Sequence, residues 1–155
     1  MSAPAGIDPR GPRFGAGITA VLLLVVIGLS LGGLIVPALI IFAAQTLLFA
    51  WGAFAGIQRH PYGLLFKRLV RPRLKPPAEL EDPVPPTFAQ GVGFLITAIG
   101  VILTLLGLTL ALPIAAALAF IAAFLNSVFG YCLGCQIYLL LVRARVLRRS
   151  SAASA

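Results

Sequence analysis

The chain has 155 residues, of which 60% are hydrophobic and 10% are charged. Soluble domains carry about 25% charged residues, so this composition excludes a soluble globular fold and indicates one membrane domain over residues 1–155. The formal charge of +8 does not indicate a nucleic-acid-binding protein, because the basic residues flank apolar runs and form no patch with aromatic side chains.

Four apolar runs predict an all-α protein with four transmembrane helices. A span of about 20 residues crosses a hydrocarbon core of roughly 30 Å, and it must be helical because lipid offers no partner to free backbone groups. Pro37 and Pro113 mark two tight turns. We expect the spans at about 15–34, 38–57, 88–112, and from 114 to either 131 or 142.

The last apolar run has two interpretations. As one helix from 114 to 142 it would measure about 43 Å, which exceeds the hydrocarbon core by more than tilt alone absorbs. A break near Gly130 would shorten the span and place a second helix at the membrane interface. The uniformly apolar segment 137–142 favours the long helix, and both interpretations stay open at this point.

All Lys and Arg residues lie in three segments outside the spans. The positive-inside rule therefore predicts a multi-pass protein of the cell inner (cytoplasmic) membrane, with both termini and the loop 58–87 in the cytoplasm. The twelve residues are Arg10 and Arg13; Arg59, Lys67, Arg68, Arg71, Arg73 and Lys75; and Arg143, Arg145, Arg148 and Arg149.

The sequence repeats itself. Residues 8–14 and 82–88 share the pattern D-P-x-x-P-x-F, and residues 69–73 resemble residues 141–145. Pro37 and Pro113 sit at corresponding turns. We therefore predict two pseudo-repeated helical hairpins of the same orientation, which is a parallel repeat.

The only two cysteines, Cys132 and Cys135, stand three residues apart. A C-x-x-C pair can work as a redox dithiol, carry sulfur, supply half of a metal site or simply pack helices together. If it opens a helix at the interface, peptide dipoles and nearby arginines favour a thiolate, so Cys132 is the candidate nucleophile and Cys135 the resolving thiol. The repeat aligns the sole histidine, His60, with Cys132, which makes His60 a weaker candidate partner.

A structural zinc site needs four ligands, and two thiols with one histidine do not supply them. We expect no metal and no cofactor. No enzyme active site other than the C-x-x-C is recognisable.

A short amphipathic helix is predicted after the second span. Leu65, Phe66, Leu69 and Val70 share one face of it, opposite the basic residues. Such a helix lies in the headgroup region and binds anionic lipid. The basic face consists of Lys67, Arg68 and Arg71.

Four phrases of the sequence, at 7–14, 69–73, 79–83 and 130–135 (GYCLGC), together resemble domain-of-unknown-function family 4395. These are small actinobacterial integral membrane proteins, and the resemblance covers nearly the whole chain. The family has no established activity, so it implies no catalytic role. Its genes often neighbour genes for thioredoxin-like and rhodanese-like proteins, which implies thiol or sulfur chemistry and a partner of that kind.

Three functions fit these observations. The first is a cytoplasm-facing dithiol that exchanges electrons or sulfane sulfur with a soluble thioredoxin-like or rhodanese-like protein. The second is a small transporter for a sulfur-containing solute, which would need a homo-oligomer because four spans enclose little space. The third is a structural membrane subunit.

Overall fold

A computed structural model of the protein describes residues 6–148 and is α-helical throughout, apart from turns and loops. Arg149 and both ends of the chain lie outside the described residues. The prediction of an all-α protein is confirmed. Two short 3₁₀ turns, η1 (Ile57–Arg59) and η2 (Arg71–Arg73), flank α3. The helices are α1 (Arg10–Leu31), α2 (Ile35–Ala55), α3 (Pro61–Leu69), α4 (Val84–Leu105), α5 (Ala111–Phe129) and α6 (Leu133–Arg143).

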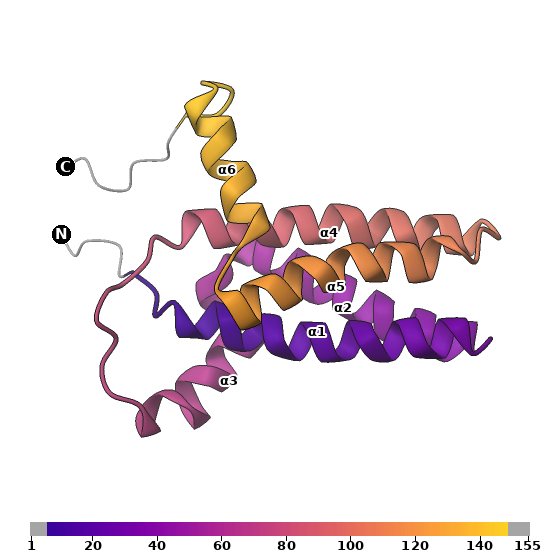
Figure 1. Ribbon diagram of the computed structural model, residues 1–155, viewed down its shortest axis with the longest axis horizontal. Coiled ribbons are helices and arrows are strands. Elements are labelled where there is room, and N and C mark those ends of the chain that lie inside the picture. The colour runs from indigo at the N-terminus through magenta and orange to yellow at the C-terminus, as the bar shows by residue number, and fades with distance from the viewer. Residues whose placement is uncertain (1–5, 149–155) are drawn as a thin grey trace.

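Within the described residues, four helices are long and apolar enough to cross a membrane: α1, α2, α4 and α5. The longest have 22 residues and measure about 33 Å, which matches the hydrocarbon core. They lie side by side as a bundle (Figure 1). Large apolar side chains such as Leu24, Leu47, Leu95 and Leu118 are exposed on the outside of the bundle. A surface of this kind fits lipid, so the chain is a multi-pass membrane protein.

The third span begins and ends earlier than expected. α4 covers Val84–Leu105 instead of 88–112, and the turn that follows contains Gly107 with a φ of 98°. Pro113 lies inside the first turn of α5 and not in the loop. A proline fits there because the first N–H groups of a helix have no intrahelical partner.

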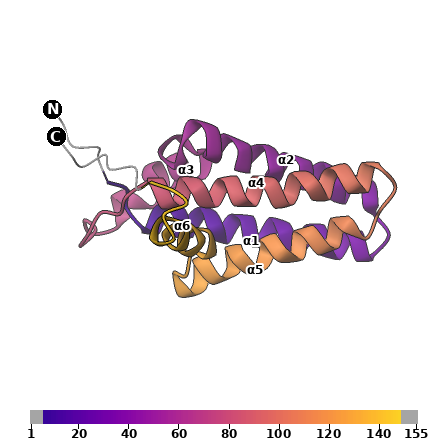
Figure 2. The same ribbon diagram turned by 90° about the horizontal axis from the view of Figure 1, so that it is seen from above.

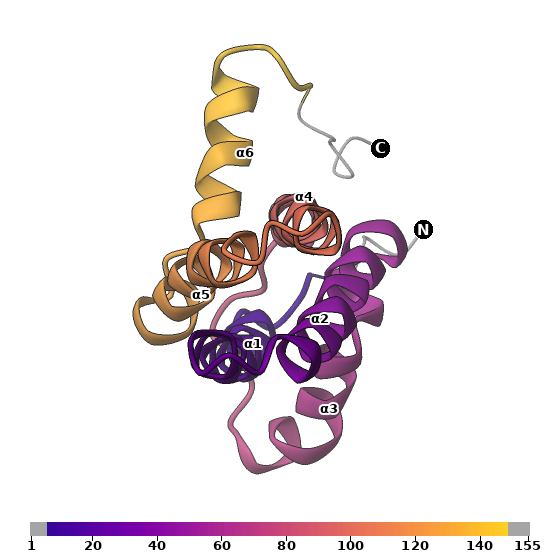
Figure 3. The same cartoon turned by 90° about the vertical axis from the view of Figure 1, so that its right-hand side faces the viewer.

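The last apolar run is broken into two helices. α5 ends at Phe129, and Gly130 follows in the left-handed conformation with φ 65°. The N–H of Gly130 donates to the carbonyl of Asn126 (3.1 Å), and that of Tyr131 donates to Leu125 (3.2 Å). This is a helix C-cap that favours glycine. α6 then projects from the bundle, with its axis running across the long axis of the spanning helices (Figures 1 and 3).

The two halves have the same local geometry at their turns. Gly33 and Gly107, which are 74 residues apart, both have positive φ, at 82° and 98°. The N–H of Gly33 donates to Ser30 at 3.1 Å, and the N–H of Gly107 donates to Thr104 at 3.0 Å. Corresponding hydrogen bonds at both turns support a duplicated helical hairpin.

The packing of the helices follows the same two-fold pattern. α1 packs on α5 as α4 packs on α2, and α1 contacts α3 as α4 contacts α6. In the view from above, the hairpin of α4 and α5 lies across that of α1 and α2, so that helices of the two hairpins alternate (Figure 2). α3 and α6 project in opposite directions from one end of the bundle (Figure 3).

The pseudo-two-fold axis passes between Ile7 and Glu81. These equivalent residues, 74 apart, form an isolated antiparallel bridge in which each N–H donates to the other's carbonyl at 2.9 Å. Next to them, Asp8 accepts the N–H of Arg10 (3.0 Å) and Asp82 accepts the N–H of Val84 (2.9 Å). Both aspartates thus satisfy free N–H groups where a spanning helix starts.

The apolar core lies in the half of the bundle nearer the two hairpin turns. It consists of Leu23 and Val26 of α1, Ala38 and Phe42 of α2, and Leu112, Ala115, Ala116 and Ala119 of α5. Small alanines let α5 approach its neighbours closely. The other half of the bundle, where α3 and α6 begin, contains a cavity and the two cysteines.

Candidate functional site

A disulfide joins Cys132 and Cys135, whose Cα atoms are 5.2 Å apart. Cys132 is the N-cap residue of α6, with extended backbone angles (φ −86°, ψ 102°). Its Sγ accepts a hydrogen bond from the backbone N–H of Cys135 at 3.3 Å. The sulfur thus takes the place of the side-chain oxygen that usually caps a helix. Both residues are half-buried.

Gly134 positions this disulfide against α4. A Cβ atom built on Gly134 would lie only 2.6 Å from the Cα of Ala89. Any other residue would therefore push the first turn of α6 away from α4. Gly130 supplies the left-handed turn before the pair, so each glycine of the 130–135 motif has a separate structural role.

Two positive features lie near the start of α6. The N-terminus of α6 carries the positive end of the helix dipole. The guanidinium of Arg13 lies beside the preceding loop, since a Cβ built on Gly130 would be 3.4 Å from its Cζ. A helix N-terminus and a neighbouring arginine are both features that activate cysteine thiols.

His60 is the N-cap residue of α3, and its Nδ1 accepts the backbone N–H of Tyr62 at 3.2 Å. The side chain is 4% exposed. This burial lowers the pKa of His60 from its ordinary value of 6.5. The backbone of Leu48 raises the pKa, but by less than burial lowers it. The neutral ring therefore carries its proton on Nε2, and this atom makes no hydrogen bond.

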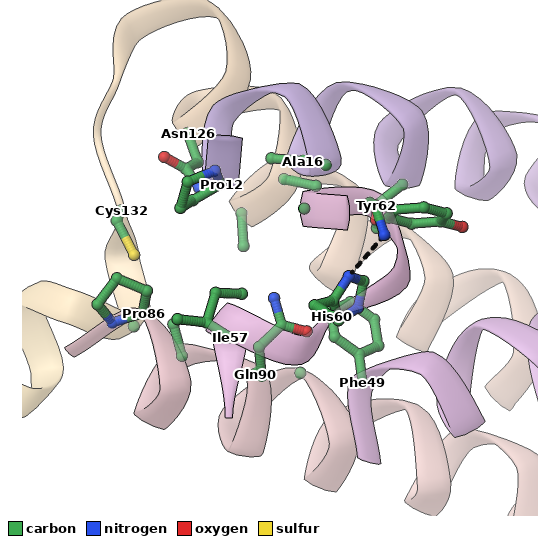
Figure 4. Close-up of a pocket in the computed structure, with 18 of the residues that line it drawn as sticks. Pro12, Ala16, Phe49, Ile57, His60, Tyr62, Pro86, Gln90, Asn126 and Cys132 are labelled. Carbon is green, nitrogen blue, oxygen red and sulfur yellow. Dashed lines mark hydrogen bonds between the residues drawn. The ribbon is translucent and has the colours of Figure 1, made fainter. Parts of the chain in front are cut away.

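A cavity of about 360 Å³ lies between the spanning helices and the starts of α3 and α6. His60 and Cys132 both line it, on opposite sides (Figure 4). The structure thus brings together the two residues that the repeat aligns, but it does not place them in contact. Thr19 and Tyr62, also in the wall, both hydrogen-bond to Gln45, at 3.3 and 3.2 Å.

The cavity lies near the pseudo-two-fold axis. Pro12 of α1 and its equivalent Pro86 of α4 line it on opposite sides, as do Ala16 and its equivalent Gln90 (Figure 4). Equivalent positions differ in their side chains, because Gln90 is a polar amide whereas its counterpart Ala16 has only a methyl group. The same holds for the thiol-bearing Cys132 opposite the imidazole of His60.

Sequence reasoning assigned no role in the site to Gln90. Its Oε1 is buried without a hydrogen bond, and its Nε2 is directed into the cavity (Figure 4). A Cβ built on Gly52 of α2 would lie 2.7 Å from Cγ of Gln90, so this glycine makes room for the side chain. A glutamine inside an otherwise apolar span was the available signal.

The basic cluster lies beside the cavity mouth. Lys67, Arg68 and Arg71 are all exposed, and Lys67 and Arg71 also line the cavity. The predicted apolar face is not uniform, because Phe66 is buried against Phe14. Leu65 and Leu69 remain exposed. Among residues 6–148, no group of three His, Cys, Asp or Glu side chains could hold a metal ion.

The fold and the site define a polytopic α-helical membrane protein with a disulfide at the start of α6. The chain belongs to the family described as Domain of unknown function (DUF4395), whose model matches residues 7–143. The family resemblance of the sequence motifs is thereby confirmed. No curated protein and no solved structure matches the chain.

Proposed function

We propose that the protein is a membrane-bound dithiol that undergoes thiol–disulfide exchange through Cys132 and Cys135. The observation that carries this proposal is the N-cap position of Cys132, whose Sγ accepts the N–H of Cys135 at 3.3 Å. The same N–H would stabilise a thiolate at Cys132 in the reduced protein. A C-x-x-C that served only to pack helices would need no such capping geometry.

The exchange proceeds through one mixed disulfide. In the reduced protein, the Cys132 thiolate attacks a partner disulfide, forms a bond to one partner sulfur and releases the other as a thiolate. Cys135 then attacks the Cys132 sulfur, closes the intramolecular disulfide and releases the partner dithiol. Two electrons and two protons pass to the partner, and the reverse direction uses the same intermediate.

A persulfide partner would react at the same sulfur. The Cys132 thiolate takes the outer sulfur of the partner persulfide, and the partner leaves as a thiol. Attack of Cys135 on the Cys132 sulfur then forms the disulfide and releases hydrogen sulfide. The partner in either reaction is a soluble thioredoxin-like or rhodanese-like protein.

The pair faces the cytoplasm in this proposal. The basic residues of the described chain cluster at the end of the bundle where α3 and α6 begin, and the two hairpin turns carry none. The positive-inside rule then orients the disulfide toward the cytoplasm, in the inner membrane of the cell.

The same end of the protein would bind anionic lipid. Lys67 and Arg68 on α3 and Arg71 on η2 are exposed beside the exposed leucines Leu65 and Leu69. A headgroup phosphate attracts the cations while the leucines enter the acyl region. This arrangement would hold α3 at the membrane surface next to the cavity mouth.

A trapping experiment tests the exchange. The Cys135→Ser variant keeps the nucleophile and lacks the resolving thiol, so it should accumulate a mixed disulfide with oxidised thioredoxin or with a cytoplasmic partner. Cys132→Ser is the matched control and should give several-fold less adduct. Equal adduct yields from the two variants would contradict the assignment of Cys132, and no adduct from either would contradict exchange.

A further inference from the structure

We propose that the cavity beside Cys132 binds a quinone, which accepts the two electrons released when Cys132 and Cys135 form their disulfide. This inference rests on the proposed dithiol function and names the small molecule that would reoxidise the pair. Cys132 belongs to the cavity wall, and its sulfur lies on the cavity side (Figure 4). A ring bound there would lie next to the reactive sulfur.

The interior of the cavity favours an uncharged ligand. Apolar side chains such as Phe49, Ile57 and Ile96 make up much of the wall. Burial keeps the ring of His60 neutral at physiological pH by lowering its pKa, and Asp8 is paired with Arg10 at 2.7 Å. The remaining charges of the wall, on Lys67 and Arg71, are exposed at the rim. A sulfur anion inside would lose its hydration without gaining a buried cation.

The polar groups of the cavity suit a ligand with two carbonyl oxygens. The amide of Gln90 on α4 directs its Nε2 into the space (Figure 4), and packing against Gly52 restricts its movement. A second amide, that of Asn126 on α5, also lines the cavity. Two amide donors on different helices match two acceptors at opposite edges of a ring. A volume of about 360 Å³ is within the range of small-molecule sites.

Exposed apolar residues of the wall would admit such a ligand from the membrane. Leu118 and Ile121 of α5 and Ile137 of α6 line the cavity and are also exposed, at 53%, 51% and 42%. An opening between these side chains would lead to the lipid, whereas one beside Lys67 and Arg71 would lead to water. Quinones dissolve in the bilayer, which is the phase from which this opening accepts a ligand.

The reaction balances with the groups at hand. Cys132 and Cys135 each lose a hydrogen, and a sulfur–sulfur bond forms between them. The quinone takes up the two electrons and two protons and becomes a hydroquinone, whose two carbonyl oxygens are then hydroxyl groups. A soluble partner dithiol restores the protein dithiol by exchange, so electrons pass from the partner through the cysteine pair to the membrane quinone.

Duroquinone is a suitable probe, because its ring is fully methylated and thiols reduce it without adding to it. The purified protein in lipid nanodiscs is reduced, freed of reductant and mixed with duroquinone, and disulfide formation is followed by maleimide gel shift. Wild type should form one disulfide per hydroquinone produced. Gln90→Leu should slow this oxidation by about tenfold, as expected for one lost hydrogen bond. Ala16→Leu, which fills the opposite wall, should slow it as well.

Gln136→Leu is the matched control, because Gln136 is exposed on α6 and lies outside the cavity; it should be oxidised at the wild-type rate. Exchange with reduced thioredoxin is measured on the oxidised form of the same proteins. Wild type that exchanges with thioredoxin but is not oxidised by duroquinone would overturn the quinone site and leave the proposed function standing. Oxidation unaffected by Gln90→Leu and Ala16→Leu would likewise overturn the site, and failure of both reactions would overturn the proposed function too.

Discussion

His60 and Cys132, which are 72 residues apart, occupy equivalent positions: each caps the short helix that leaves the bundle, and both line one cavity. His60 accepts the N–H two residues ahead, and Cys132 accepts the N–H three residues ahead. One duplicated capping position thus carries an imidazole in the first half and a thiol in the second. This equivalence places the sulfur of Cys132 on the cavity side, opposite His60 (Figure 4).

The N-cap geometry predicts unequal reactivity of the two thiols. In Cys135→Ser the remaining Cys132 should react with iodoacetamide at neutral pH several-fold faster than Cys135 does in Cys132→Ser. The reason is that the helix dipole and the N–H of Cys135 act on the capping sulfur, and the guanidinium of Arg13 lies beside Gly130 in the loop before it. Rates are measured by mass spectrometry in detergent, and replacing Arg13 by Gln should narrow the difference. Equal rates in the two single-cysteine proteins would argue against a favoured thiolate at Cys132.

The close approach of α6 to α4 predicts a large effect at Gly134. Gly134→Val should destabilise the protein by about 1–3 kcal/mol, because the new side chain collides with the backbone of Ala89. Gly28→Ala is the control, since nothing lies within 4 Å of a Cβ at that helical position, and it should be neutral or slightly stabilising. Thermal unfolding in detergent, followed by circular dichroism, compares the two. Equal melting temperatures would show that α6 does not pack on α4 at this point.

The left-handed turn at Gly130 predicts a graded series. Gly130→Ala should cost about 1–2 kcal/mol, because a φ of 65° is unfavourable for a residue with a Cβ. Gly130→Asn should cost less, since asparagine tolerates this conformation better. A continuous helix through 130 would instead be stabilised by alanine. The sign of the Gly130→Ala effect on the melting temperature therefore decides between a broken and a continuous last run.

Buried His60 predicts a loss of stability in acid. Burial lowers its pKa in the folded state, so the unfolded chain binds the proton more readily once the pH falls below about 6.5. Stability is therefore greatest above this pH and decreases as the pH falls toward the folded-state pKa. His60→Asn keeps a capping side chain and does not titrate. Its melting temperature should change less than that of wild type from about pH 8 to about pH 5. If the melting temperatures of the two proteins fall in parallel over this range, His60 is not the cause of the loss of stability in acid.

Membrane orientation predicts one-sided labelling. In reduced inverted vesicles, an impermeant maleimide should label Cys132 and Cys135, because the charge distribution directs this end toward the cytoplasm. Leu108→Cys in a Cys132→Ser, Cys135→Ser background is the control, since Leu108 is exposed in the opposite turn. It should be labelled in right-side-out vesicles only. The reverse labelling pattern would show that the protein has the opposite orientation in the membrane.

Much of the fold follows from the sequence, because lipid requires helices and the length of an apolar run sets the length of a span. The predicted boundaries of the spans agree less well with the helices of the structure. α4 ends at Leu105 rather than at 112, since proline is compatible with the first turn of a helix and Pro113 belongs to α5. Apolar residues continue through both sides of such a turn, so hydropathy alone does not mark it. Gly107 was the more informative residue there.

The candidate site was predicted only in part. The 72-residue offset between the two halves aligned His60 with Cys132. This alignment needs only the sequence and no knowledge of how the helices pack. The role of Gln90 depends on neighbours from another helix, above all Gly52, and no local pattern encodes that contact. A cavity is a property of several helices together, so its volume and its lining could not be read from a single segment.

The proposed function requires that Cys132 and Cys135 form a reversible redox pair. The most direct measurement is a redox titration of isolated membranes in glutathione buffers, with the state of the pair read by maleimide gel shift. We expect one reversible two-electron transition, with a midpoint inside the range that glutathione or thioredoxin can reach. A pair that stays oxidised even in excess dithiothreitol, or stays reduced in oxidised glutathione, would contradict it.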